Sequence, residues 1–325
     1  MRIAVLDDYA DAFRAAPAFA RLAGHEVTVF RDTMKDPEEL AARLQDMDAV
    51  VLTQQRSTFP AAVVERLPRL RLISQTGRNF SHLAVDACTR QGVVVSAGGA
   101  GGPDSTAELA WALILAALRH IPEEAQRLKD GLWQGSVGTR LKGRVLGVYA
   151  YGRIGSTVAR VGRAFNMRVV CWGREGSTER ARADGYEVAT SREAFFAEAD
   201  VLSLHILMND ATRGIVRAAD LALMKPTALL VNTSRAQIIE AGALVAALKA
   251  GRPGFAAVDV YEEEPVLGAA HPLIGMPNVL CTPHLGYAES SVFEAIYEVA
   301  VDQILAFAAG APVNVVNPEA VRAGG

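Results

Sequence analysis

The sequence is poor in the residues that build disulfide frameworks and metal sites. Its 325 residues include three cysteines and six histidines. The cysteines, Cys88, Cys171 and Cys281, are widely spaced and form no Cys-x-x-Cys pair. We therefore interpret them as reduced core residues of a cytoplasmic protein. The histidines show no spacing typical of metal ligands, so we expect no metal site.

Long apolar runs and clusters of positive charge are missing as well. The longest apolar helical run, residues 107–118, is too short to cross a bilayer. Near the N-terminus, Asp7 and Asp8 interrupt a short apolar run, which predicts a first strand rather than a signal peptide. The net charge is −3 and no basic block occurs. We therefore expect neither a membrane nor a nucleic-acid partner.

Residues 2–99 alternate between strand and helix patterns. The chain length suggests about two domains, and half of the residues are hydrophobic, which is ample for their cores. A helix is predicted over residues 37–45. Asp36 is placed to cap it, and Pro37 takes its first position. Residues 60–66 form another helical pattern. The β-rich runs are 3–6, 27–30, 49–52, 72–74 and 93–95. Five such repeats predict a parallel, doubly wound lobe.

A second α/β lobe is predicted after the glycine-rich residues 97–103, which we interpret as a crossover between domains. Ser105 and Glu108 have capping-box spacing and predict the start of a helix that stops near His120. That helix is apolar on nearly every face, so we expect it to be buried on all sides. Further strands are predicted at 145–150, 169–170, 201–204, 229–232, 256–258 and 279–281. Further helices are predicted at 156–165, 192–198, 217–224, 241–250 and 290–308.

Residues 143–174 contain a glycine fingerprint in the context that favours dinucleotide binding, a strand, a tight turn, a helix and a second strand. Gly152 would let a pyrophosphate approach the backbone N–H groups at the helix start, around Arg153 and Ile154. Gly155 would let the helix lie close to the sheet. Ala150 stands where the fingerprint has its first glycine. An ordinary tight turn is the alternative interpretation.

The end of the second strand of this unit bears on the choice of cofactor. NAD enzymes place a carboxylate there for the ribose hydroxyls, about 20 residues beyond the turn. Gly173 occupies that position in this chain, and Arg174 follows it. No carboxylate would repel a 2′-phosphate, and Arg174 could pair with one. We therefore expect NADP to be accepted.

Two loops follow strands of the first lobe, where ligands of doubly wound sheets bind. Arg56 lies in the first loop, and Gly77, Arg78 and Asn79 form the second. Free backbone N–H groups around Gly77–Asn79, helped by either arginine, could hold a small carboxylate. The alternative is that both are plain surface loops with solvated arginines.

Three segments follow strands of the second lobe. In the first, Arg235 can bind a carboxylate through two parallel hydrogen bonds of its guanidinium. In the second, residues 262–264 form an acidic cluster. In the third, His284 lies between a proline and a leucine-glycine pair. Each also has a plain interpretation, as an exposed ion pair, a solvated acidic loop and a loop histidine. Their meaning depends on whether they meet in space.

Taken together, Asn-Thr-Ser-Arg ending at Arg235, Asp-Val-Tyr-Glu-Glu-Glu-Pro from Asp259, and Thr-Pro-His-Leu-Gly around His284 resemble the D-isomer-specific 2-hydroxyacid dehydrogenases. The resemblance covers essentially the whole chain. It implies a Rossmann dinucleotide-binding domain, residues 101–287, inserted into a flavodoxin-like substrate domain, residues 1–100 and 288–325.

The resemblance also implies roles for single residues. Arg235 would bind a 2-oxo acid, His284 would be the acid/base, and Glu264 its carboxylate partner. Thr233 and Asp259 would contact the cofactor, and the N–H groups of Gly77–Asn79 would hold the substrate carboxylate. Ala236 departs from the family, which usually has glycine after the arginine.

We therefore expect an NAD(P)-dependent enzyme that converts a small 2-oxo acid, such as glyoxylate or hydroxypyruvate, into a D-2-hydroxy acid. It is expected to work as a cytoplasmic homodimer. Two other activities remain open, a formate or phosphite dehydrogenase on the same fold, and a dinucleotide-sensing, partner-binding protein of the corepressor type.

Overall fold

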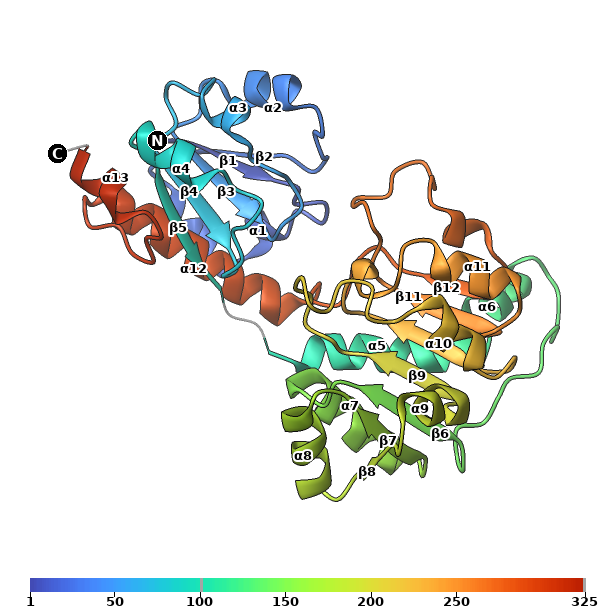
Figure 1. Cartoon of the computed structure of the whole chain (residues 1–325). Coiled ribbons are helices and arrows are strands. Elements are labelled where there is room, and N and C mark those ends of the chain that lie inside the picture. The colour runs from blue at the N-terminus through green and yellow to red at the C-terminus, as the bar shows by residue number, and fades with distance from the viewer. Residues whose placement is uncertain (100–101, 324–325) are drawn as a thin grey trace. The chain divides into compact units, whose positions relative to one another are not determined.

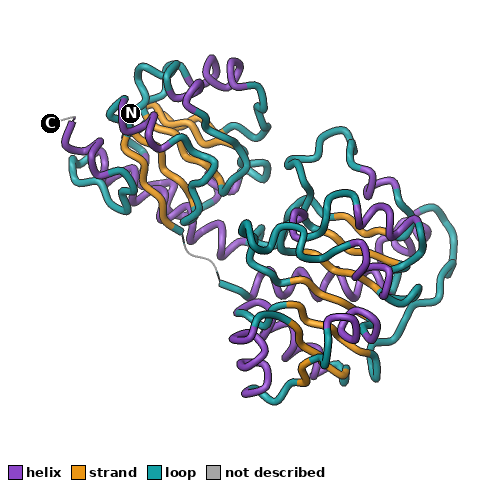
Figure 2. The backbone as a smooth tube through the Cα atoms, viewed as in Figure 1, coloured by secondary structure: helices purple, strands orange, loops and turns teal. Residues whose placement is uncertain are grey.

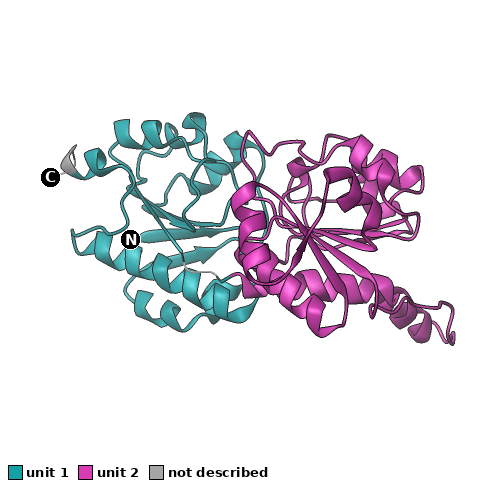
Figure 3. Cartoon of the chain, turned by 60° about the horizontal axis from the view of Figure 1, so that its bottom comes forward, with its two compact units in different colours: residues 1–102, 288–325 teal, residues 103–287 magenta. Residues whose placement is uncertain are grey.

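The chain forms two compact units in the computed structural model, which describes residues 1–99 and 102–323 (Figures 1 and 3). Unit 1 comprises residues 1–102 and 288–325, and unit 2 comprises residues 103–287. Each unit has one sheet of parallel strands with helices on both faces (Figure 2). The predicted fold class is confirmed. Ala100 and Gly101, part of the predicted crossover, lie outside the described residues.

Unit 1 has a five-stranded sheet in the flavodoxin-like order β2-β1-β3-β4-β5. The strands are β1 (Arg2–Leu6), β2 (Glu26–Val29), β3 (Ala49–Thr53), β4 (Leu72–Thr76) and β5 (Val94–Gly98). The helices are α1 (Ala12–Ala15), η1 (Pro17–Leu22), α2 (Pro37–Leu44), α3 (Ala61–Val64), α4 (Val85–Arg90), α12 (Ser290–Ala308) and α13 (Pro318–Ala323). The 3-10 helices are labelled η.

Both faces of this sheet are covered, which is why its strands are continuous apolar runs. Helices α2, α3 and α4 share one core with the sheet. On the other side, α12 packs against β4, β5 and η1, and Tyr297 meets Phe13 edge to face at 5.0 Å between ring centroids. The last long helix of the chain therefore packs in unit 1, with the N-terminal strands.

Unit 2 has a seven-stranded sheet in the order β12-β11-β10-β9-β6-β7-β8. The strands are β6 (Val145–Tyr149), β7 (Arg168–Trp172), β8 (Glu187–Val188), β9 (Val201–Leu204), β10 (Leu229–Asn232), β11 (Phe255–Val258) and β12 (Val279–Cys281). The helices are α5 (Asp104–Leu118), α6 (Ile121–Lys129), α7 (Arg153–Ala164), α8 (Glu175–Ala183), α9 (Arg192–Glu198), α10 (Ala218–Leu223), η2 (Ala236–Ile238), α11 (Ala243–Lys249) and η3 (Pro272–Gly275).

This strand order is that of a Rossmann sheet, with the chain building outward from β6 in both directions. Helices α5 and α7 pack on one face of the sheet and α9, α10 and α11 on the other. The order reverses between β6 and β9, so the carboxyl ends of these strands mark the point where ligands bind in such sheets. The glycine turn after β6 lies there.

Local signals in the sequence explain several element ends. The carboxylate of Asp36 accepts hydrogen bonds from the N–H groups of Glu38 and Glu39, at 2.8 and 3.0 Å. This is the predicted cap of α2. Cys88 and Cys171 are buried, Cys281 is half-buried, and all three thiols are free.

Helix α5 departs from the prediction in two ways. It begins at Asp104, and Ser105 lies inside its first turn without capping it, so the predicted capping box is wrong. The side chain of Leu115 is 36% exposed. The helix is therefore not buried on all sides, because its outer face is not covered by the rest of unit 2.

Several elements have no counterpart among the predicted ranges: the helices α1, η1, α4, α6, α8, η2, η3 and α13 and the two-residue strand β8. Helices α6 and α8 are mostly polar and exposed, so they lack the apolar stripe by which a packed helix is recognised. Among the described residues, no helix combines the length and the apolar character that a membrane span requires.

Candidate active site

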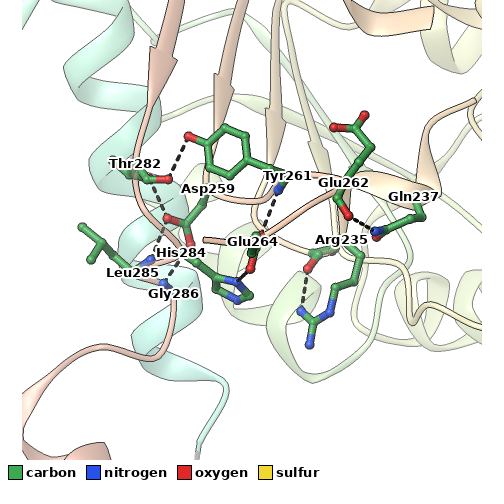
Figure 4. Close-up of polar contacts among 11 residues, drawn as sticks. Arg235, Gln237, Asp259, Tyr261, Glu262, Glu264, Thr282, His284, Leu285 and Gly286 are labelled. Carbon is green, nitrogen blue, oxygen red and sulfur yellow. Dashed lines mark hydrogen bonds and ion pairs between the residues drawn. The ribbon is translucent and has the colours of Figure 1, made fainter. Parts of the chain in front are cut away.

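A histidine and a carboxylate from two neighbouring strand ends form a short hydrogen bond. Glu264 lies in the segment after β11 and His284 in the segment after β12. The two side chains point toward each other (Figure 4), with His284 Nδ1 2.5 Å from Glu264 Oε2. Because an ionised carboxylate can only accept, Nδ1 carries the proton. Nε2 is then the ring nitrogen left to exchange a proton with a ligand.

The turn that carries His284 is anchored to the sheet by a buried carboxylate. His284 has a left-handed backbone with φ of 54°, which is uncommon for a residue other than glycine. Asp259, directly after β11, accepts hydrogen bonds from Thr282 Oγ1 at 2.6 Å and from the N–H groups of Leu285 and Gly286 at 2.7 and 2.8 Å. These bonds on both sides of the histidine fix its position.

Burial raises the pKa of the Asp259 carboxyl above its ordinary value of 3.8, although the three hydrogen bonds and the charge of His284 oppose this shift. Asp259 is fully buried, and its two carboxylate oxygens already accept the bonds from the histidine turn. Its contact with a nicotinamide stays a prediction. The arrangement found gives Asp259 a second task, which is to hold the loop of His284.

Glu264 stays ionised despite its partial burial. Burial alone would raise the pKa of its carboxyl. The hydrogen bond and charge of His284, the N–H of Tyr261 and the charge of Arg235 outweigh this effect and hold the pKa below the ordinary 4.5. Around neutral pH the pair therefore has a negative carboxylate facing the imidazole. The carboxylate fixes the orientation of the ring through Nδ1.

Arg235 lies at the end of the next strand of the sheet, β10. Its side chain is exposed, and Nη1 donates to the carbonyl of Ser234 at 2.7 Å. The backbone there is held by Asn232, whose Nδ2 donates to the carbonyl of Arg235 at 3.0 Å. Ala236 is buried at the start of η2, so the methyl group that replaces the usual glycine fits. Strand ends β10, β11 and β12 thus bring Arg235, Glu264 and His284 to one edge of the sheet.

One residue of this site was not singled out from the sequence. The N–H of Tyr261 donates to Glu264 Oε1 at 2.9 Å, and the Tyr261 hydroxyl donates to the carbonyl of Thr282 at 3.0 Å. Tyr261 stands inside the motif that begins at Asp259, but no spacing rule predicts the direction of its hydroxyl. Only the folded structure relates it to the histidine turn.

The glycine turn after β6 has the form that a dinucleotide site requires. At Gly155 an added Cβ would lie 2.3 Å from the carbonyl oxygen of Ala150, so only glycine lets α7 approach the strand this closely. At Gly152 an added Cβ would meet nothing within 4 Å. The backbone at the start of α7 is therefore open to a ligand. Ala150 has φ of 75°, a conformation that glycine adopts more readily.

Two further features of unit 2 fit a bound dinucleotide. The Oγ1 of Thr233 is buried and has no hydrogen-bond partner among the described residues, as expected of a group that a ligand satisfies. Helix α7 presents its positive end behind Gly152. The contacts of Gly152, Arg153, Ile154, Gly155 and Thr233 with a cofactor stay predictions.

The region after β7 is rich in arginine. Gly173 follows the strand and is half-buried, and Arg174 is exposed at the start of α8. From the same helix, Ser177 Oγ accepts from the N–H of Tyr151 at 2.7 Å, and Arg180 donates to the carbonyl of Tyr151 at 3.3 Å. Helix α8 is thereby fastened to the glycine turn. Its first residues lie where the second strand of a Rossmann unit meets the adenosine ribose.

In unit 1, the predicted anion-binding loop follows β4. The N–H of Gly77, whose φ is 117°, already donates to the carbonyl of Gly98 at 2.7 Å. The N–H groups of Arg78 and Asn79 have no acceptor among the described residues. A carboxylate would therefore be held by those two groups rather than by Gly77.

Arg56, the other predicted anion ligand of unit 1, follows β3. Its guanidinium lies over the ring of Tyr9, 4.6 Å from the centroid, and Nη1 donates to the carbonyl of Asp7 at 2.5 Å. Arg56 is thus held in place on the first lobe rather than extended into solvent. Its binding of a substrate stays a prediction.

Residues 111–286 match the NAD-binding domain of the D-isomer-specific 2-hydroxyacid dehydrogenases. A glyoxylate reductase of Aeropyrum pernix is 37% identical over 295 residues, which are 88% of this chain and 87% of that protein.

Two solved structures are similar throughout. An oxidoreductase from Ralstonia solanacearum is 48% identical with a TM-score of 0.94, and covers 98% of both chains. A phosphoglycerate oxidoreductase from Vibrio cholerae is 46% identical with a TM-score of 0.91, and covers 96% of this chain and 100% of its own.

Proposed function

Because this chain belongs to the D-isomer-specific 2-hydroxyacid dehydrogenase family, we propose that it reduces a small 2-oxo acid with a nicotinamide dinucleotide to give a D-2-hydroxy acid. The observation that carries the proposal is the short bond between Glu264 and His284 at one strand edge with Arg235. A loop histidine without a role would need neither a half-buried carboxylate partner nor an anchored turn.

His284 is the proton donor in this proposal. When bound, the reduced nicotinamide supplies the hydride, which goes to the carbonyl carbon while negative charge grows on the carbonyl oxygen. Nε2 of the protonated imidazole gives its proton to that oxygen. Glu264 stabilises the imidazolium and fixes the ring orientation through Nδ1. A positioned acid of this kind accelerates a reaction by roughly 10²–10⁴-fold.

Arg235 supplies fixed positive charge. Its exposed guanidinium can pair with the substrate carboxylate and lie beside the oxygen on which charge develops. On unit 1, the N–H groups of Arg78 and Asn79 have no acceptor among the described residues and can donate hydrogen bonds to a carboxylate. The glyoxylate reductase of Aeropyrum pernix and the phosphoglycerate oxidoreductase of Vibrio cholerae favour glyoxylate-like and phosphorylated acids as first candidates.

NADPH is the proposed cofactor. The position usually taken by a ribose-binding carboxylate is Gly173, and the exposed Arg174 follows it. A guanidinium there would form charge-assisted hydrogen bonds with a 2′-phosphate. NADH lacks that phosphate and would gain nothing from Arg174.

The protein is further proposed to be a homodimer. Large apolar side chains are exposed on α6 and the segment after it, where Trp133 is 79% and Val137 is 94% exposed. Figure 1 shows this segment running along the outside of unit 2. The first turn of α6 is acidic and its last turn basic. Two copies packed antiparallel would match these charges and cover the apolar side chains.

The protein is also proposed to act in the cytoplasm. Its three cysteines are free thiols, and reduced thiols are typical of cytoplasmic proteins.

The test is turnover of a panel of 2-oxo acids, including glyoxylate, hydroxypyruvate and a phosphorylated acid, with NADPH and with NADH. We expect reduction of at least one acid to the D-2-hydroxy acid. Tight dinucleotide binding without turnover of any acid would contradict the proposal and favour a partner-binding protein of the corepressor type. Oxidation of formate or phosphite alone would favour the other alternative.

A further inference from the structure

We propose that Tyr261 is a positioning residue that sets the geometry of the Glu264–His284 pair. This inference rests on the proposed function and adds to it a residue with two separate contacts. One contact reaches the carboxylate, and the other reaches the turn that carries the imidazole. The first is made by the backbone N–H of Tyr261 and the second by its phenol.

The first contact is made by the backbone. The N–H of Tyr261 donates to Glu264 Oε1 at 2.9 Å, while Glu264 Oε2 accepts from the imidazole at 2.5 Å. The carboxylate is therefore held at both oxygens. With one oxygen fixed by a backbone group, rotation of the carboxylate away from the ring would break a charge-assisted hydrogen bond.

The second contact is made by the side chain. The hydroxyl of Tyr261 donates to the carbonyl of Thr282 at 3.0 Å, and the N–H of His284 donates to the same carbonyl at 3.0 Å. Figure 4 shows the ring of Tyr261 reaching across to this turn. The phenol thus ties the strand end of Glu264 to the turn of His284, two residues from the imidazole.

Burial makes this tie effective. Tyr261 is only 6% exposed, and burial raises the pKa of its phenol, so the hydroxyl keeps its proton at neutral pH and remains a donor. Asp259 anchors the histidine turn from the other side through Thr282 Oγ1. Thr282, at the start of the turn, is therefore held through its hydroxyl by Asp259 and through its carbonyl by Tyr261. The phenol fixes the separation of the two ionisable groups.

The test is the Tyr261→Phe variant of the full-length protein. It removes only the hydroxyl, and keeps the ring and the N–H that holds Glu264. Loss of one neutral hydrogen bond is typically worth about 1 kcal/mol, so we expect kcat for the best 2-oxo acid to fall about 5- to 10-fold. The Kd for the reduced cofactor and the KM for the acid should change less than about 2-fold, because the phenol touches neither.

The pH profile separates positioning from a purely structural role. A loosened turn weakens the contact of His284 with Glu264, which is one of the causes that lower the pKa of Glu264. The acid limb of kcat/KM should then move to higher pH in Tyr261→Phe. Tyr149→Phe is the matched control, because Tyr149 is also buried and its phenol oxygen accepts a hydrogen bond from Arg192 Nη1 at 3.1 Å. This bond is not part of the Glu264–His284 pair. It should cost stability and leave the acid limb in place.

Wild-type protein is assayed first. If it reduces no acid, the proposed function fails, and this inference fails with it. If it is active and Tyr261→Phe has the same kcat and the same acid limb, only the positioning role is refuted. Equal losses of kcat in Tyr261→Phe and Tyr149→Phe, with both acid limbs unmoved, would refute it as well.

Discussion

Glu264 and His284, which are 20 residues apart in the chain, meet through Oε2 and Nδ1 at 2.5 Å. Each reaches this position from the end of a different parallel strand, β11 or β12, and each backbone is held separately. A pair held in this way has consequences for stability as well as for catalysis.

The pair should make the protein sensitive to acid. Glu264 has its pKa below the ordinary 4.5 in the folded protein, so its stabilising effect is complete above the unfolded value and is lost as the pH falls through the folded value. Glu264→Gln should lower the free energy of unfolding by about 1–2 kcal/mol at neutral pH. The deficit should shrink as the pH falls through the folded pKa of Glu264, which lies below 4.5. Urea unfolding of wild type and Glu264→Gln at several pH values measures this difference in free energy. A difference that does not change with pH would contradict the stabilising role of the ionised Glu264.

Ala150 should be a site where glycine stabilises the fold. Its φ of 75° lies in the left-handed region, where an L side chain costs about 1–2 kcal/mol. We expect Ala150→Gly to raise the free energy of unfolding by up to about 1 kcal/mol, after the greater chain entropy of glycine is subtracted. Ala246→Gly is the control, since Ala246 is exposed inside α11 and should lose about 1 kcal/mol. If both variants lowered the free energy of unfolding, the proposed backbone strain at Ala150 would be contradicted.

Arg174 should decide between the two cofactors. Removing one charge-assisted hydrogen bond costs about 1.5–3 kcal/mol, so Arg174→Ser should lower kcat/KM for NADPH by about 10-fold or more and leave that for NADH nearly unchanged. Arg182→Ser, an exposed arginine in the last turn of the same helix, should change neither. A wild-type enzyme with a large NADH preference would refute the assignment.

Trp133 should hold the dimer together. Replacing an exposed aromatic anchor at an interface costs about 2 kcal/mol or more of binding free energy. Wild-type protein is expected to sediment as a dimer, and Trp133→Ser to dissociate at higher concentration than wild type. Val313→Ser, in which an exposed valine of unit 1 is replaced, should remain dimeric. A monomeric wild type would show that the α6 segment does not serve self-association.

Much of the fold follows from the sequence, because buried parallel strands are continuous apolar runs between turn residues. Strands β9, β10 and β12 begin and end where the pattern predicts. Helices α6 and α8 were missed since polar, exposed helices carry no stripe that separates them from loops. The start of α5 at Asp104 shows the limit of cap rules, which choose poorly among neighbouring Asp, Ser and Thr residues.

The site was predictable as a set of strand ends, but its internal bonds were not. The sequence pattern placed the segments of Arg235, Glu264 and His284 after strands of one sheet, and the family resemblance singled out these three residues. The bonds of Asp259 to the histidine turn and the reach of Tyr261 depend on how the loops fold back. The same holds for Gly77, whose N–H is taken by Gly98. No pattern in the sequence predicts that choice of acceptor.

The most direct measurement is the single-turnover rate of hydride transfer to the preferred 2-oxo acid in His284→Gln. His271→Gln is the matched control, because His271 also binds a glutamate, Glu262, at 2.9 Å. We predict that His284→Gln slows the transfer by about 10²–10⁴-fold with the Kd for reduced cofactor unchanged, and that His271→Gln stays near wild type. A His284→Gln enzyme that turns over at nearly the wild-type rate would contradict the assignment of His284 as the proton donor.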